Sequence, residues 1–309
     1  MALPLVLSLL TATPHPTPII AIMSHPHGKQ QYMAASYVKW IELAGGRVMP
    51  LNYHSTDAEV DAVFEQVNGA LFMGGGAKLP PAARRLWSKA AVANAAGDVF
   101  PIWGSCLGFE WIMQLASGDD NILTNGFDSE NLTLPLNLTA TGASSRILSP
   151  AASMPVPFNS PPLSVLDALN LPVTMNNHNQ GVTPASFEAS SALRSTFTVI
   201  STNVDRKGTE FVSMVEGTSM PVWATQWHPE KNIFEQGVSL PSGLPYEVVQ
   251  HTRAAISVSQ YLVGFFVDQC RQSTHRFTSA TAEWDSLIYK YTTSMEMAPE
   301  FVQTYLFGY

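Results

Sequence analysis

One cysteine, Cys106, stands at a position where the chain could place a reactive thiol, within the sequence WGSCLGFE of residues 103–110. A short apolar run precedes it, as in a buried strand, and apolar residues recur at helical spacing after it. A strand, a tight turn that carries a nucleophile and a helix form the elbow of the G-x-S-x-G motif, here G-x-C-x-G. The small residues Gly104 and Gly108 would let the backbone turn sharply and let the strand pack closely on the helix. The pattern therefore predicts a nucleophile at a strand–helix turn.

The reactivity of Cys106 depends on its ionisation. A free thiol has a pKa of about 8.5, so little of it is thiolate at neutral pH. At a helix N-terminus, unpaired N–H groups and the helix dipole favour the thiolate. The alternative is a small buried core residue, which is the usual place of a free cysteine. Other parts of the sequence have to decide between the two.

A second informative stretch is VWATQWHPEK, residues 222–231. An apolar run leads into His228, and Pro229 should end the strand because proline cannot donate to a sheet. In an extended chain, residues two apart point to the same side, which would bring Glu230 close to His228. A histidine oriented by a carboxylate is what an activated nucleophile requires, whereas an isolated pair of this kind is more often a surface hydrogen bond.

A third stretch, FMGGGA at residues 72–77, follows another apolar run. Glycines after a strand allow a backbone N–H to point into a site without a side chain in the way. Acyl transfer needs such donors for the developing oxyanion, and the N–H groups of Gly75 and Leu107 are the candidates. An ordinary loop or a phosphate loop is the alternative, but the G-x-x-x-x-G-K-[ST] pattern is missing. His178, in NNHNQG, would by itself suit an exposed loop.

Strands and helices alternate along the first part of the chain. We expect strands at residues 18–23, 47–51, 69–72 and 99–103, and helices at residues 31–44, 58–67 and 82–96. Alternation of this kind predicts an α/β fold in which helices cover both faces of a mostly parallel sheet. Ligands gather at the carboxyl ends of the strands in such sheets, and the glycine turn and Cys106 both fall at such ends.

The later part of the chain is less regular. Residues 117–184 are rich in Asn, Ser, Thr and Pro and could form hairpins and loops that wall the site. Strands are expected at residues 197–201, 210–216 and 221–227, followed by a long helix at residues 252–270. The aromatic tail suits a docked terminus.

Composition limits the class of protein. The 309 residues are 46% apolar and 13% charged with a net charge of −8, which is enough for a large core. Scattered Lys and Arg argue against nucleic-acid binding, and no apolar stretch is long enough for a membrane span. Two cysteines make a disulfide framework unlikely, and Cys270 is expected to be a packing residue. No histidine pair has a zinc spacing, so neither a metal nor another cofactor is expected.

Two features bear on the cellular location. The apolar N-terminus, residues 1–16, is expected to be a short signal peptide or a disordered segment, although it lacks a basic start. Residues 17–309 would then form a single catalytic domain. Sequons at Asn131 and Asn137 would be glycosylated if the chain entered the secretory pathway.

Together these residues resemble a known family. The motifs WGSCLGFE, TQWHPEKN (residues 225–232) and GALFMGGG (residues 69–76) are similar to those of gamma-glutamyl hydrolases. YMAASYVKWIELAGGRVMPL (residues 32–51), LPLNLT (residues 134–139) and LIYKY (residues 287–291) are similar too. The resemblance implies a class I glutamine amidotransferase-like fold, a flavodoxin-like arrangement of three layers with the sheet between helices.

The resemblance also implies roles for individual residues. Cys106 matches the family's nucleophile, His228 its base, Glu230 its orienting carboxylate and His178 a histidine of the substrate cleft. The implied substrates are folate poly-gamma-glutamates, and the implied location is the lysosome, the vacuole or the outside of the cell. Homodimers occur in the family, although nothing in this sequence indicates one. Because the substrates are polyanions and the protein is acidic, a locally basic cleft is expected. Lys78 and Arg146 are candidates for holding carboxylates, and Glu110 is a further substrate-binding candidate.

Two other functions remain open at this point. One is a glutaminase that passes ammonia to a synthetase, although such proteins typically carry Gln where this chain has Glu110. The other is a non-catalytic protein that binds glutamyl or folate ligands, against which the intact set of Cys106, His228 and Glu230 argues.

Overall fold

A central sheet of eight strands organises the structure, a computed structural model that describes residues 15–297 and 299–308. The strand order is β4-β1-β5-β6-β14-β13-β12-β9. Neighbouring strands from β4 to β14 are parallel, and those from β14 to β9 are antiparallel. In sheet order the strands are β4 Arg47–Leu51, β1 Ile19–Met23, β5 Gly69–Phe72, β6 Ile102–Ser105, β14 Val222–Thr225, β13 Glu210–Gly217, β12 Phe197–Val204 and β9 Asn137–Leu138. The predicted mostly parallel sheet is confirmed.

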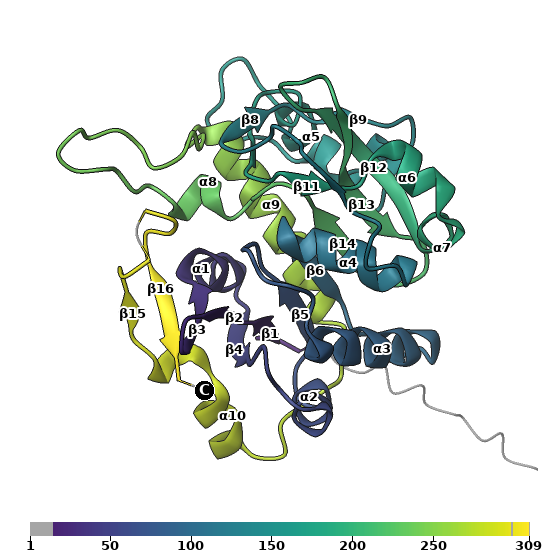
Figure 1. Cartoon of the computed structure of the whole chain (residues 1–309), viewed down its shortest axis with the longest axis vertical. Helices are drawn as coiled ribbons and strands as arrows, with labels where there is room; N and C mark the ends of the chain where they lie inside the picture. The colour runs from purple at the N-terminus through teal and green to yellow at the C-terminus, as the bar shows by residue number, and fades with distance from the viewer. Residues whose placement is uncertain (1–14, 298, 309) are drawn as a thin grey trace, which may run out of the picture.

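Helices cover both faces of this sheet because its central strands are buried on both sides. Every residue of β1, β5, β6 and β14 is buried, and such strands need a layer above and below them. Alternate residues of β1 enter two different cores: Ile20 and Ile22 face one, and Ile19 and Ala21 face the other. Figure 1 shows α1 and α9 on one side of the sheet and α2 and α3 on the other, which gives three layers.

Some of the helices begin at a residue whose side chain caps them. The Thr56 side chain forms a capping box with Glu59 at the start of α2, and the Thr252 hydroxyl accepts the Ala255 N–H at the start of α9. No helix among the described residues is long and apolar enough to cross a membrane.

The α-helices are α1 Ala35–Leu43, α2 Asp57–Phe64, α3 Pro81–Ala95, α4 Leu107–Ser117, α5 Val165–Ala168, α6 Pro184–Ala189, α7 Ser191–Thr196, α8 Lys231–Phe234, α9 Arg253–Cys270 and α10 Ala280–Ser286. Short 3-10 helices are η1 Gly142–Ser144, η2 Pro150–Ser153 and η3 Ile288–Lys290.

The predicted helix over residues 31–44 is wrong in its first part. Gln30–Ala34 form strand β3, and the helix begins only at Ala35. β3 pairs with β16, Thr304–Phe307, from the other end of the chain. A second sheet, β15-β16-β3-β2, results, with β2 at His25–His27 and β15 at Thr293–Ser294. The partner strand lies about 270 positions away, so local periodicity could not reveal it, and the aromatic tail docks as predicted.

Residues 117–184 consist mainly of short pieces, as expected. Strand β8, Leu132–Leu134, pairs with β10, Thr174–Asn176, and strand β7, Thr124–Asn125, pairs with β11, Gln180–Gly181. Figure 1 shows a long loop between α8 and α9 that projects from the body of the protein. Most of the predicted N-terminal segment lies outside the described residues, and the single domain over residues 17–309 stays a prediction.

Candidate active site

Cys106 occupies the predicted elbow between β6 and α4. Its backbone has φ 53° and ψ −109°, a conformation that is rare for a residue other than glycine. Two hydrogen bonds hold it there, from Cys106 N–H to Thr225 O at 2.8 Å and from Glu110 N–H to Cys106 O at 3.0 Å. A Cβ on Gly108 would lie 1.9 Å from Phe72 O, so only glycine lets α4 approach the sheet this closely. The strand–turn–helix elbow of the sequence analysis is therefore present.

His228 and Glu230 form a buried hydrogen-bonded pair beside this elbow. His228 Nδ1 lies 2.7 Å from Glu230 Oε1, and both side chains are at most 5% exposed. Strand β14 runs parallel to β6 and aligns Thr225 with Ser105, so the pair emerges at the same sheet edge as Cys106. The sequence analysis expected the contact from an extended chain, but β14 ends at Thr225 and a turn brings the two side chains together.

Gly74 lies close to both the histidine and the cysteine. A Cβ at this position would lie 2.5 Å from His228 Cε1 and 3.3 Å from Cys106 Cβ. Glycine is thus required where the imidazole and the cysteine side chain approach the same backbone atom from two sides. The three stretches that carry the sequence motifs therefore meet at one point of the fold.

Tyr37 belongs to this cluster, although its position in the sequence indicated only a core residue of α1. Its hydroxyl accepts the Gly74 N–H at 2.8 Å and lies 3.2 Å from His228 Nδ1. Burial and the nearby Glu230 carboxylate raise the pKa of Tyr37 well above its ordinary value, so the hydroxyl keeps its proton. No sequence signal distinguishes this tyrosine from other apolar-facing residues.

The ionisation of Cys106 differs from the sequence expectation. The residue is 5% exposed, and burial raises the pKa of its thiol well above the usual range. The carboxylate of Glu110 raises this pKa further, while Lys231 and the Leu107 N–H lower it. The helix N-terminus therefore does not overcome the effect of desolvation on the thiol. The thiol therefore needs a base at the moment it reacts.

The residues of the two candidate oxyanion donors, Gly75 and Leu107, line the same cavity as Cys106. Gly75 is exposed with φ 154°, and its N–H has no hydrogen-bond partner among the described residues. A Cβ on Gly75 would lie 2.4 Å from Nδ1 of His25, a fully buried ring that fills the space behind the glycine. Leu107 is the first residue of α4, whose N–H has no partner within the helix.

Cys106 lines two cavities. The larger has a volume of about 1090 Å³, and the smaller about 500 Å³. Both are lined by Cys106, Gly75 and Asn177. His228 faces only the smaller cavity. The larger is lined by Lys78, Leu107, Glu110 and His178 among others.

His178 is buried in the wall of the larger cavity. Its Nδ1 lies 2.7 Å from Gln180 O, and its ring packs against Phe127 and Phe211. Burial lowers the pKa of His178 to about 4, so the ring is neutral at neutral pH. The carbonyl fixes the proton on Nδ1, which leaves Nε2 as a hydrogen-bond acceptor. This Nε2 atom is buried without a partner among the described residues.

Glu110 and Arg146 differ in how they relate to the cavities. Burial raises the pKa of Glu110 to about 7, and Gln226 Nε2 donates to its Oε1 at 3.1 Å. Arg146 lines neither cavity. Its guanidinium donates to Gly217 O, pairs with Glu216 at 3.4 Å and lies over Trp223. These contacts hold Arg146 outside both cavities and give no support to the expectation that it holds substrate carboxylates, which stays a prediction.

Sequence reasoning missed a group of residues that closes the smaller cavity. Lys231, 2% exposed, donates to both carboxylate oxygens of Glu247, and Asn177 Nδ2 donates to Glu247 Oε1 at 2.8 Å. The Val248 N–H donates to Asn131 Oδ1 at 2.6 Å. These bonds fasten the loop between α8 and α9 across the cavity. The sequence did not indicate these contacts, because charged residues in a loop do not by themselves show what they bind.

The two sequons differ in their surroundings. Both asparagines are exposed. Asn131 lines the smaller cavity, while Asn137 lies on β9, where its Nδ2 donates to Thr202 Oγ1 at 3.3 Å.

Comparison with known sequences gives a consistent result. The family model described as Peptidase C26 matches residues 18–230. A gamma-glutamyl hydrolase of Mus musculus is 39% identical over 290 residues, which cover 89% of this chain and 83% of the relative. Gamma-glutamyl hydrolase B of Dictyostelium discoideum is 34% identical over 307 residues, 94% of this chain and 83% of the relative. The Homo sapiens gamma-glutamyl hydrolase is 34% identical over 84% of this chain and 78% of its own.

Comparison with solved structures concerns the fold. The glutaminase domain of Trypanosoma brucei CTPS, solved with bound acivicin, superposes with a TM-score of 0.51 at 16% identity. The match covers 83% of this chain and 95% of that domain. The chain thus shares its three-layer fold with that domain.

Proposed function

Because the chain belongs to the peptidase C26 family, and is a cysteine-type hydrolase, we propose that it cleaves γ-glutamyl peptide bonds in folate poly-γ-glutamates. The observation that carries this proposal is the buried His228–Glu230 pair, whose imidazole lies near Cys106: a Cβ on Gly74 would be 2.5 Å from His228 Cε1 and 3.3 Å from Cys106 Cβ. A protonated thiol beside an oriented imidazole is the arrangement that nucleophilic catalysis by cysteine needs.

In the first half of the proposed reaction, Cys106 attacks the γ-carbonyl carbon of the substrate. Its thiol proton passes to His228, whose other ring nitrogen is held by Glu230. The N–H groups of Gly75 and Leu107 donate to the oxygen that becomes negative. The C–N bond then breaks as the imidazolium gives the proton to the leaving amine, and a thioester on Cys106 remains.

In the second half, water hydrolyses the thioester. His228 removes a proton from the water, the resulting hydroxide adds to the carbonyl carbon, and the same two N–H groups stabilise the second oxyanion. The C–S bond breaks, the sulfur regains a proton from the imidazolium, and a γ-carboxylate is released.

Recognition of the substrate falls to the larger cavity in this proposal. His178 presents Nε2 as an acceptor, which suits an N–H of the bound glutamyl residue. Lys78 is exposed at the same cavity and would attract a carboxylate. Glu110, whose pKa is raised to about 7, would be partly protonated at neutral pH and could donate or accept a hydrogen bond.

The test is a product analysis of a folate pentaglutamate digest, with wild type beside Cys106→Ala. Wild type should shorten the tail, and the variant should show no hydrolysis with an unchanged circular dichroism spectrum. The other buried thiol provides a matched control, because Cys270 is also a free cysteine but lies in the helix–sheet core. Cys270→Ala should keep its turnover. Comparable cleavage by Cys106→Ala, or release of ammonia from glutamine without cleavage of γ-glutamyl chains, would contradict the proposal.

We also propose that the protein works in the secretory pathway, in the lysosome or vacuole or outside the cell. Exposure of Asn131 and Asn137 would allow glycosylation there. Protein from its native host should then shift in mobility on endoglycosidase treatment, and Asn137→Gln should remove part of the shift. Unglycosylated protein from that source would argue against this location.

A further inference from the structure

The two cavities beside Cys106 divide the substrate of the proposed reaction into an acyl part and a leaving part. The atom that receives a proton from His228 is the leaving nitrogen. His228 lines the smaller cavity and not the larger one, so the leaving group occupies the smaller cavity. Leu107, Glu110 and His178 line only the larger cavity, which takes the acyl part.

The smaller cavity carries an excess of negative charge. Its lining includes one cation, Lys231, whose ammonium is held by Glu247 at 2.5 Å. Two further carboxylates, Glu130 and Glu300, line it without an ion pair to any cation among the described residues. The negative charge of Glu300 also acts on Tyr32, another residue of this cavity. Burial raises the pKa of Tyr32, and Glu300 raises it further. The leaving-group side thus has a net charge of about −2, with both uncompensated charges exposed to the incoming ligand.

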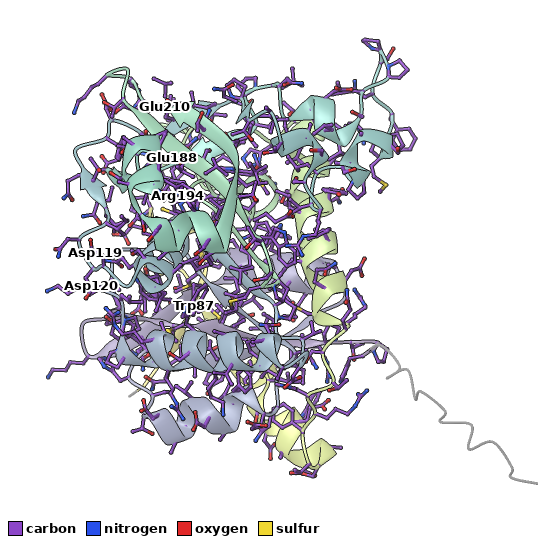
Figure 2. All side chains as sticks on the ribbon, turned by 90° about the vertical axis from the view of Figure 1, so that its right-hand side faces the viewer. Trp87, Asp119, Asp120, Glu188, Arg194 and Glu210 are labelled. Atoms are coloured by element: carbon purple, nitrogen blue, oxygen red, sulfur yellow. The ribbon has the colours of Figure 1, made fainter. Side chains whose placement is uncertain are left out.

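The larger cavity is different in charge as well as in volume. Two cations line it, Lys78 and Arg84, of which Arg84 pairs with Asp120 at 2.5 Å. Asp120 is exposed and is labelled at the edge of the protein in Figure 2. Lys78 has no ion pair among the described residues. Three carboxyl groups line this cavity as well, Glu110, Asp120 and Glu130, of which the two cavities share Glu130. The acyl side is therefore less acidic than the leaving-group side, at about twice its volume.

These charges act differently on short and long leaving groups. Each residue of a γ-linked glutamate chain adds one α-carboxylate, so a leaving chain of several residues brings several negative charges into an acidic cavity. A single leaving glutamate brings two carboxylates together with the amine that gains a proton as the bond breaks. The amine is common to both leaving groups, so nearby carboxylates favour its protonation equally, but they repel the longer chain more because it carries more carboxylates.

We propose that the acidic smaller cavity restricts the leaving group to one glutamate, so that the enzyme removes terminal residues one at a time. The inference rests on the proposed function and adds the position of the cut. In each cycle the last γ-amide C–N bond breaks, free glutamate leaves with the proton from His228, and the shortened folate chain stays on Cys106 as the thioester. Water then releases that chain, which returns as the next substrate.

The first test follows the products of a pteroyl pentaglutamate digest over time by liquid chromatography. Tetra-, tri- and diglutamate should appear in that order, with one free glutamate released for each cut. Early appearance of pteroyl monoglutamate together with intact oligoglutamate would overturn the proposal. A digest with no cleavage at all would contradict the proposed function instead, so the two failures are distinguishable.

The second test changes the charge of the smaller cavity alone. Glu300 is exposed in the C-terminal segment and lines only the smaller cavity. Glu300→Gln should raise the ratio of internal to terminal cuts about fivefold at low salt, with a smaller rise at high salt. Glu188→Gln is the matched control, since this exposed residue lies on α6, on the face seen in Figure 2, and lines neither cavity. An unchanged ratio in Glu300→Gln, or an equal rise in Glu188→Gln, would overturn the proposed role of the acidic cavity.

Discussion

The reacting centre and the walls of the two cavities are built in opposite ways. Cys106, His228 and Glu230 are at most 5% exposed and follow the ends of β6 and β14, two fully buried parallel strands. Lys78 and Glu300 are exposed and come from a loop and from the C-terminal segment. The centre is therefore set by the sheet, while the walls are set by segments that can change without disturbing it.

The difference has an energetic consequence. Buried polar groups interact strongly, and removing one partner leaves another without compensation. Charges at an exposed wall are screened by water and salt, so each contributes little. Substitutions in the centre should therefore abolish turnover, whereas those in the walls should redirect it. The predictions below test this contrast, beginning with the largest effect.

The base of the centre should show the largest loss after Cys106 itself. His228→Asn should lower kcat by about a thousandfold or more, because no other group can take the thiol proton. Glu230→Gln should lower it less, by about tenfold to a hundredfold, since the amide still accepts a hydrogen bond from the imidazole. Steady-state kinetics with thermal unfolding as a control would check both. A kcat of His228→Asn within tenfold of the wild-type value would contradict the contrast between the reacting centre and the cavity walls.

Tyr37 should behave as a positioning residue of the centre. Tyr37→Phe removes the hydroxyl that accepts the Gly74 N–H and contacts His228 Nδ1. The freed N–H is buried, which costs about 1–3 kcal/mol of stability. We expect kcat to fall about tenfold with KM little changed, because the imidazole loses a hydrogen-bonding neighbour that helps to hold it in place. A pure loss of stability, with kcat unchanged, would make Tyr37 structural only.

Glu110 lines the larger cavity, and its charge acts on the Cys106 thiol. Replacing it should therefore change the pH at which the thiol reacts. The Glu110 carboxylate raises the pKa of Cys106, so the neutral side chain in Glu110→Gln should lower that pKa. The rate of iodoacetamide alkylation would then rise at a lower pH than in wild type. Glu188→Gln, remote from the thiol, should leave the profile in place. A shift of Glu110→Gln toward higher pH would reverse the sign of this interaction.

The smallest expected effect concerns stability rather than turnover, and it tests the buried ring behind Gly75. Burial lowers the pKa of His25 from 6.5 to about 3. Between these two values the unfolded chain binds more protons than the folded one, so the His25 contribution to stability falls as pH falls. His25→Gln lacks this contribution. Between pH 7 and pH 4.5, wild type should therefore lose about 2 kcal/mol more unfolding free energy than the variant. Urea unfolding at both pH values measures the difference, and parallel losses would show that His25 is accessible to protons.

Much of the centre was predictable because its determinants are local. The apolar run before Cys106 and the glycines around it specify a strand, a tight turn and close helix packing. In the same way, VWATQWHPEK contains both the strand that aligns with β6 and the turn that brings His228 to Glu230. Adjacent strands of a parallel sheet end at the same edge, so these local patterns implied that the motifs would meet.

The remaining features depend on contacts between distant segments. β3 forms because β16, at the other end of the chain, pairs with it, and Arg146 turns away because Glu216 and Gly217 engage it. Residue types and short-range spacing thus determined which groups could react and on which kinds of element they lie. Only the tertiary structure decided the ionisation of Cys106, the place of Tyr37 and the charge of each cavity, because burial and long-range electrostatics depend on every segment that packs nearby.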